Sequence, residues 1–260
     1  ETNKWNNYKI VSITSDTMTL QKTEDELLKY YKTNYVINPN ENYDKIIVSS
    51  SGCYGTCAIF DLLISKNDNS LFFGERYNSK NGIFSAKISK DLFKEIENSF
   101  KKSNITKLKN RYSSNWTDLN EISVTFIKDN KIIKTVSDYG GEAPDEFRMS
   151  YLRTNYLYQT LDLENKKEIL PFQSIGQVSK SNKLIYFEKS EIFYLFYLLL
   201  NGKELPAKKI STIYTLKGFG KNDEETEIKS DGRFFVFNNR LIDIGFNFFE
   251  LNDFTNRNLD

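Results

Sequence analysis

The chain has 260 residues, with 36 Lys and Arg residues against 35 Asp and Glu residues, two cysteines and no histidine. Histidine is the usual general base near neutral pH and the commonest transition-metal ligand. Its absence excludes a Ser-His-Asp triad, a Cys-His dyad and the zinc sites that need histidine. We expect no metal site and no cofactor. The formal net charge of +1 argues against a general nucleic-acid binder, because such proteins need a basic face.

Residues 1–42 are predicted to form an N-terminal strand and a short helix. The strand is expected to end at Ser15, because apolar residues alternate before it: Trp5, Tyr8, Ile10 and Ile13. Thr23 and Glu26 have the spacing of a helix capping box, which predicts a helix over residues 27–31. The turn-forming residues 38–42 then mark a domain boundary.

Residues 43–163 are predicted to form a core domain built around a cysteine hairpin. Strands are expected at residues 45–49, 59–64, 71–77, 83–88, 122–126 and 132–136. One helix is expected to follow its cap at Ser89, and Pro144 is expected to open another. Because the predicted strands neighbour one another along the chain and a helix follows each set, we predict an α+β fold, with antiparallel sheets and a few helices packed on one face.

Residues 164–260 are predicted to form a β-rich unit with one apolar helix. Ser190 is expected to cap that helix over residues 191–200. The strands are predicted at residues 184–187, 210–216, 227–229, 233–237 and 241–246. Asp231-Gly232, between two apolar runs, is the strongest hairpin signal in the chain.

The most specific local motif is Gly52-Cys53-Tyr54-Gly55-Thr56-Cys57. With its neighbours it resembles an uncharacterised bacterial family, a domain of unknown function whose members typically show Cys-Phe-Gly-Thr-Cys-Pro-Val-Tyr at this place. The resemblance extends over residues 44–163 and departs from the family at Ala58, where Pro is usual. It implies a secreted or lipoprotein-type protein of the cell envelope and carries no known activity.

The first residue is Glu1, which fits either a fragment or the removal of a signal peptide or lipoprotein leader that would have provided a lipid anchor. No apolar run reaches the ~18–20 residues of a membrane span, so no transmembrane segment is predicted. A pair of cysteines this close together fits an oxidising compartment or a reducing one.

Cys53 and Cys57 can close a small disulfide if their Cα atoms lie about 4.4–6.8 Å apart, and Gly55 permits the tight turn. The alternative is a redox-active pair. The loop lacks the Cys-x₂-Cys spacing and the helix N-terminus that lower the pKa of a thiol in thioredoxin-like proteins, so a structural role is favoured.

Five further residues are candidates for function. Tyr54, Tyr112 and Trp116 are expected to form an exposed aromatic binding surface, together with Asp61 and Asp118. Asp61 is expected at an exposed strand position, and a hydrolase would need it or Asp118 to converge with a second carboxylate. The basic stretch Lys101, Lys102, Lys107, Lys109 and Arg111 is interpreted as a solvated loop.

The leading hypothesis is a non-enzymatic envelope or secreted protein with a binding or structural role and an unknown protein or glycan partner. No catalytic residue is assigned under this hypothesis. The first alternative is a thiol/disulfide redox protein that uses Cys53 and Cys57, and the second is a carboxylate-dependent hydrolase.

Overall fold

The computed structural model describes residues 7–35, 37–67, 69–166, 170–181, 183–206, 208–220, 222 and 224–254. The chain divides into two compact units, residues 1–37 and residues 38–260. Trp5, at which the predicted first strand begins, lies outside the described residues.

The small unit contains a three-stranded antiparallel sheet with the order β1-β2-β3. Its strands are β1 (Lys9–Ile13), β2 (Thr17–Gln21) and β3 (Leu27–Tyr31). The predicted helix over residues 27–31 is therefore wrong. Thr23 and Glu26 close a hairpin loop, in which the Glu26 amide donates to the Thr23 carbonyl and the Lys22 amide to the Glu26 carbonyl. Pairing with β2 satisfies backbone groups that so short a helix would leave without partners.

The large unit is built on an eight-stranded sheet with the order β11-β7-β6-β5-β4-β9-β10-β8. All neighbours pair antiparallel except β8 and β10, which are parallel. The strands are β4 (Lys45–Ser50), β5 (Ile59–Ser65), β6 (Ser70–Arg76), β7 (Gly82–Ala86), β8 (Arg111–Ser113), β9 (Glu121–Lys128), β10 (Lys131–Tyr139) and β11 (Glu164–Asn165).

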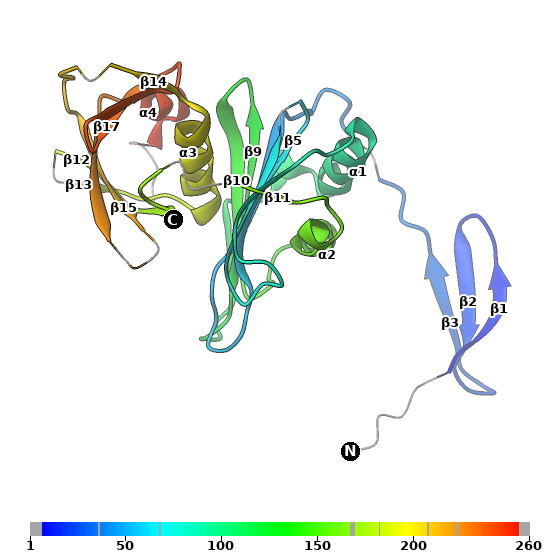
Figure 1. Ribbon diagram of the computed structural model, residues 1–260. Coiled ribbons are helices and arrows are strands. Elements are labelled where there is room, and N and C mark those ends of the chain that lie inside the picture. The colour runs from blue at the N-terminus through cyan, green and yellow to red at the C-terminus, as the bar shows by residue number, and fades with distance from the viewer. Residues whose placement is uncertain are drawn as a thin grey trace. The chain divides into compact units, whose positions relative to one another are not determined.

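Helices cover both faces of this sheet, so the predicted packing on a single face is wrong (Figure 1). Helices α1 (Lys90–Lys101) and α2 (Asp145–Asn155) pack on the face that includes Val48. Helix α3 (Lys189–Asn201) packs on the opposite face, which includes Ile47. Successive residues of a strand point to opposite faces, and here both are apolar, so each face needs its own cover.

The remaining strands form a seven-stranded antiparallel sheet with the order β13-β12-β15-β16-β17-β18-β14. They are β12 (Ser174–Lys180), β13 (Lys183–Ile185), β14 (Lys203–Leu205), β15 (Tyr214–Phe219), β16 (Glu225–Ser230), β17 (Phe234–Phe237) and β18 (Arg240–Asp243). Helix α4 (Phe248–Asn252) follows, and short 3₁₀ turns occupy Ile105–Lys107 and Leu157–Gln159. The hairpin predicted at Asp231-Gly232 is confirmed, since it joins β16 to β17.

Two helix caps show how local signals compare with the structure. Ser89 caps α1 as predicted, because its hydroxyl accepts a hydrogen bond from the Leu92 amide at 3.1 Å. The cap of α3 is Glu188, not the predicted Ser190. The Glu191 carboxylate accepts from the Glu188 amide at 3.0 Å in a capping box, while Ser190 is fully buried against the large sheet.

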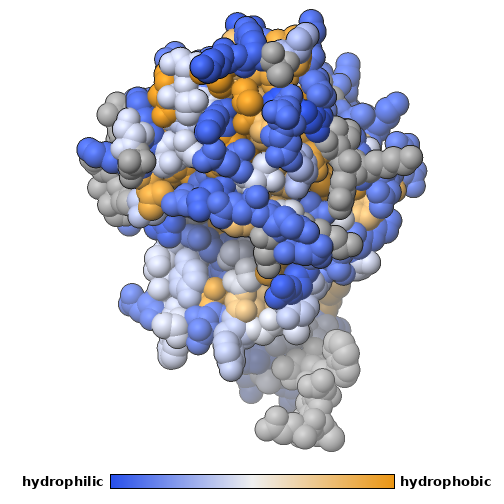
Figure 2. Space-filling view, turned by 60° about the vertical axis from the view of Figure 1, so that its left-hand side comes forward, coloured by the Kyte–Doolittle hydropathy of each residue, from blue (hydrophilic) through white to orange (hydrophobic). Residues whose placement is uncertain are grey.

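Helix α3 shares one hydrophobic cluster with both sheets. The cluster includes Ile47 and Leu63 from the eight-stranded sheet, Phe196 from α3, and Leu216 and Phe235 from the seven-stranded sheet. On the molecular face shown in Figure 2, hydrophilic residues predominate and apolar ones lie in separate groups. No helix among the described residues is long and apolar enough to span a membrane.

Candidate functional site

The loop between β4 and β5 is closed by a disulfide bond between Cys53 and Cys57, whose Cα atoms lie 5.6 Å apart. Gly55 makes the turn with φ of +151°, a conformation that side chains other than glycine's rarely permit, and its amide donates to the Cys53 carbonyl at 2.8 Å. The loop joins two strands, so neither sulfur lies at a helix N-terminus. The disulfide that the spacing allowed is therefore present.

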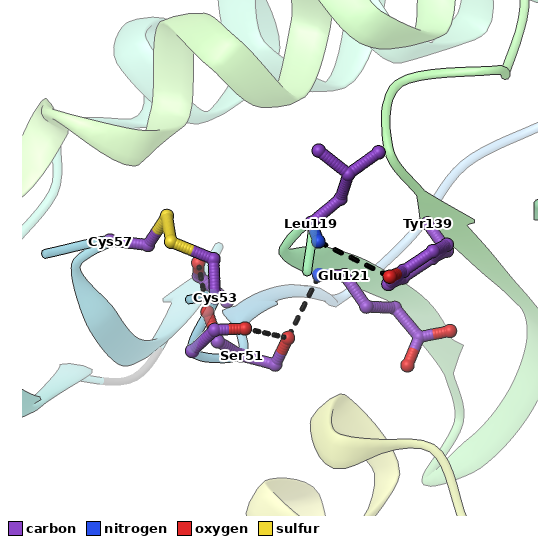
Figure 3. The surroundings of a disulfide bond; sticks show 8 residues. Ser51, Cys53, Cys57, Leu119, Glu121 and Tyr139 are labelled. Carbon is purple, nitrogen blue, oxygen red and sulfur yellow. Dashed lines mark hydrogen bonds between the residues drawn. A yellow bond between two sulfur atoms is a disulfide. The ribbon is translucent and has the colours of Figure 1, made fainter. Parts of the chain in front are cut away.

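A second loop, residues 114–120, is hydrogen-bonded to the disulfide loop. The Tyr54 amide donates to the Asp118 carbonyl at 3.1 Å. At the base of the two loops the Glu121 amide donates to the Ser51 hydroxyl at 2.8 Å, and the Ser51 amide donates to the Glu121 carbonyl at 2.9 Å (Figure 3). Strand pairing brings these loops together, because Ser50, at the end of β4, lies opposite Ile122, near the start of β9.

The second loop is also anchored to the end of β10. The Tyr139 hydroxyl accepts a hydrogen bond from the Leu119 amide at 3.2 Å (Figure 3). The Gly140 amide donates to the Asn120 carbonyl at 3.1 Å, and Gly140 has φ of +80°. A Cβ atom at Gly140 would lie 2.8 Å from the Cβ atom of Ser114, so both this close approach to the second loop and the positive φ favour glycine.

Four large apolar side chains are exposed at this end of the sheet: Tyr54, Tyr77, Trp116 and Leu119. We call them the tip surface. Tyr54 and Trp116 are 89% and 78% exposed. Tyr77 follows β6, beside the start of β5, and its neighbour Asn78 donates from Nδ2 to the Ile59 carbonyl at 2.6 Å. Tyr77 and Leu119 were not predicted, because strand pairing, not sequence distance, brings their loops to this end.

Tyr112 and Asp61 lie outside the tip surface. The ring of Tyr112 is half-buried against the core beneath α1 and α2, and its hydroxyl accepts from the Lys109 amide at 3.1 Å. Asp61 is only 4% exposed, so its predicted exposure is wrong. Its Oδ2 atom accepts from Nζ of Lys189 at 2.8 Å, because β5 presents Asp61 to the face that α3 covers.

The N-terminus of α3 brings several charged groups into one polar cluster. Lys189 also donates to the Phe60 carbonyl at 3.1 Å. Arg111 forms ion pairs with Glu121 and Glu188, each at 3.0 Å. Burial raises the pKa of the Glu188 carboxyl above its ordinary value, and the positive charge of Arg111 opposes that effect. No local pattern identified Lys189, which lies 128 residues from Asp61.

Residues 44–158 match the model of a family described as Domain of unknown function (DUF6438). We refer to the matching segment, residues 44–158, as the DUF6438 domain. No curated protein and no solved structure matches the chain. The DUF6438 domain includes the whole tip surface, whereas α3 and the seven-stranded sheet lie outside the match.

The carboxylates proposed for a hydrolase have different surroundings in the DUF6438 domain. Asp61 is buried and paired with Lys189, whereas Asp118 is exposed in a loop, where its carboxylate accepts from the Thr117 hydroxyl at 3.3 Å. Neither carboxylate lines the groove between β10 and β13, and neither lines the smaller pocket beside β6 and β7. Across the described ranges, no group of three Cys, Asp or Glu side chains is placed to hold a metal ion.

Proposed function

We propose that this protein is a non-catalytic binding protein of the cell envelope or of the secreted fraction, and that its tip surface binds a glycan. The exposure of Tyr54 and Trp116 carries the proposal. Large aromatic side chains are usually at least partly buried, and exposed groups of them commonly mark binding sites. A protein partner is the alternative occupant of the same surface.

The tip surface is ordered before any partner binds. The disulfide closes one loop. In the second loop, the Ser114 amide donates to the Tyr139 carbonyl at 3.0 Å before Trp116, and the Asp118 carbonyl accepts from the Tyr54 amide after it, so the chain is restrained on both sides of Trp116. A preordered surface loses less conformational entropy on binding than a flexible one. The arrangement therefore suits recognition by contact more than chemistry on a substrate.

The residues beside the aromatic rings favour a glycan. Sugar rings offer apolar faces to aromatic side chains and hydroxyl groups to polar ones. Asn115, Thr117 and Asp118 are all exposed and lie within two residues of Trp116, so the same loop offers hydrogen-bonding groups.

The proposed location rests on the oxidised cysteine pair. Disulfides persist in extracellular and periplasmic proteins and are rare in reducing compartments. The sequence resemblance to secreted and lipoprotein-type bacterial proteins points to the same location.

A polysaccharide array tests this function. The chain, labelled at its amino terminus, is applied to immobilised bacterial cell-wall and capsular polysaccharides. We expect at least one polysaccharide to be bound, and we expect the variant Tyr54→Ser/Trp116→Ser to bind it at least tenfold more weakly, because the stacking rings are lost.

The matched control is Leu184→Ser/Ile213→Ser, which removes two exposed apolar side chains that lie outside residues 44–158 and do not belong to the tip surface. Its affinity should equal that of the wild type, and both variants should keep the wild-type unfolding midpoint. Failure of the wild type to bind any polysaccharide, or equal binding by the tip variant, would show that the proposal is wrong.

A further inference from the structure

The eight-stranded sheet has an incomplete edge. Strand β10 runs from Lys131 to Tyr139, but β8 pairs only with Ser137–Tyr139. No strand among the described residues pairs with residues 131–136 on the side away from β9. The side chain of Asn252 occupies one position there, since its Oδ1 atom accepts from the Ile132 amide at 2.7 Å. We call residues 131–136 the open edge.

A groove of about 920 Å³ is lined both by this open edge and by β13, which is one of the two edge strands of the seven-stranded sheet. Three apolar side chains of the lining are about half exposed to solvent: Ile133, Leu184 and Tyr186. An unpaired strand edge carries a row of backbone donors and acceptors that readily accepts another strand. The groove therefore combines backbone hydrogen-bonding groups with apolar contact area.

The groove is strongly basic. Its lining contains five cationic side chains and one carboxylate: Lys109, Arg111, Lys134, Lys180, Lys183 and Glu188. Arg111 is already paired with Glu121 and Glu188. Lys109, Lys180 and Lys183 form no ion pair with any residue that the structure describes, and Nζ of Lys180 lies over the Tyr214 ring, 5.6 Å from its centroid. Their charges are available to an incoming ligand, although the net charge of the whole chain is only +1.

We infer that this groove binds an extended acidic peptide, which adds a strand to the open edge. The backbone of the peptide would pair with β10, and its alternate carboxylates would face the three unpaired lysines. Polynucleotides are also anionic, but their backbone cannot form the strand ladder that the open edge offers. This surface is separate from the tip surface, so the inference does not depend on the proposed glycan binding.

Fluorescence anisotropy with a defined probe tests the inference. The probe is a fluorescein-labelled hexapeptide of alternating Glu and Val with blocked ends, six residues long to match the open edge. We expect saturable binding that weakens at high salt. We expect the variant Lys109→Glu/Lys183→Glu to bind the probe at least tenfold more weakly, because two attractive charges become repulsive.

The matched control is Lys87→Glu/Lys94→Glu, which makes the same change in net charge at two exposed lysines outside the groove. Its affinity should lie within twofold of the wild type. Two further probes separate backbone pairing from simple charge attraction. A peptide N-methylated at alternate residues, which cannot complete the ladder, and a peptide of alternating Lys and Val should both bind at least tenfold more weakly than the Glu-Val probe.

Three outcomes would overturn the inference. The first is equal binding of the methylated peptide, and the second is tighter binding of a single-stranded oligonucleotide than of the acidic peptide. The third is a lack of peptide binding together with self-association in light scattering that Tyr186→Ser abolishes, which would make the groove an interface between copies of the chain.

Discussion

At the scale of single residues, Asp61 shows the largest difference between prediction and structure. The strand pattern predicts an exposed carboxylate, whereas the structure buries it against Lys189. Asp61 occupies a strand whose neighbours on the same face are apolar, and its carboxylate is removed from water when α3 packs there. A buried carboxylate without a cation is costly, and Lys189 supplies the compensating charge at 2.8 Å. The Oδ1 atom of Asp61 accepts no hydrogen bond from a described residue. The buried carboxylate is therefore stabilised mainly by Lys189.

We predict that Lys189→Met lowers the free energy of unfolding by about 3 kcal/mol, because it leaves Asp61 buried without its cation. Urea denaturation followed by circular dichroism measures the change. The double variant Asp61→Leu/Lys189→Met should recover most of the loss, since it removes both charges together. If the single and double variants were equally destabilised, the loss would come from packing and not from an unpaired charge.

At the scale of elements, the β4–β5 hairpin shows how a disulfide can order a loop while adding modest stability. The bond closes a loop with a sequence separation of only four residues. In the chain-entropy description, so small a loop restricts the unfolded state only slightly. Hydrogen bonds from Ser51 to Glu121, at the start of β9, and from Tyr54 to the second loop hold the hairpin in place independently of the sulfurs.

We predict that Cys53→Ser/Cys57→Ser lowers the free energy of unfolding by about 2 kcal/mol and leaves the fold intact. Urea denaturation gives the free energy, and the unchanged far-ultraviolet circular dichroism spectrum gives the fold. Loss of the native spectrum would contradict the prediction and would mean that the disulfide is needed for the sheet itself.

At the scale of the whole molecule, α3 links the DUF6438 domain to the sheet that follows it. It packs against β4, β5 and β9 on one side and contacts β12 on the other. Phe196 is buried in the cluster that contains residues of both sheets. The predicted domain boundary near residue 163 therefore stays a prediction. Because both sheets share one hydrophobic cluster, we expect them to unfold together.

We predict that Phe196→Ala destabilises both sheets together, by about 4 kcal/mol, because it opens a cavity in their shared cluster. Hydrogen exchange measured by mass spectrometry should rise in β5 and in β16 by similar factors. Faster exchange in β16 alone would mean that residues 164–260 unfold separately, as an independent domain would.

Much of the fold was predictable where the signal is local. The hairpin at Asp231-Gly232, the cap at Ser89 and the strands around the cysteine loop follow from turn chemistry and alternating apolar residues. The capping-box spacing of Thr23 and Glu26 failed because the same residues also suit a hairpin loop. Local patterns do not show which partner satisfies the backbone, and here that partner is strand β2.

The candidate site was predictable only in part, for a related reason. A short motif identifies Cys53, Tyr54 and Cys57, and a polar stretch of sequence identifies Trp116. The structure brings the two loops that carry them together. The exposure of Asp61 could not be judged correctly, since the helix that covers it begins 128 residues later in the chain. The open edge of β10 was equally hidden, because a strand's neighbours depend on the order of strands in the sheet.

By itself, the sequence determined the absence of histidine chemistry, the α+β class and the means to close a small disulfide, because each depends on residue types or on spacing along the chain. Only the tertiary structure decided that helices cover both sheet faces, that Asp61 is buried beside Lys189, and that three lysines surround an unpaired strand edge. The physical reason is that burial and charge pairing depend on which distant segments pack together.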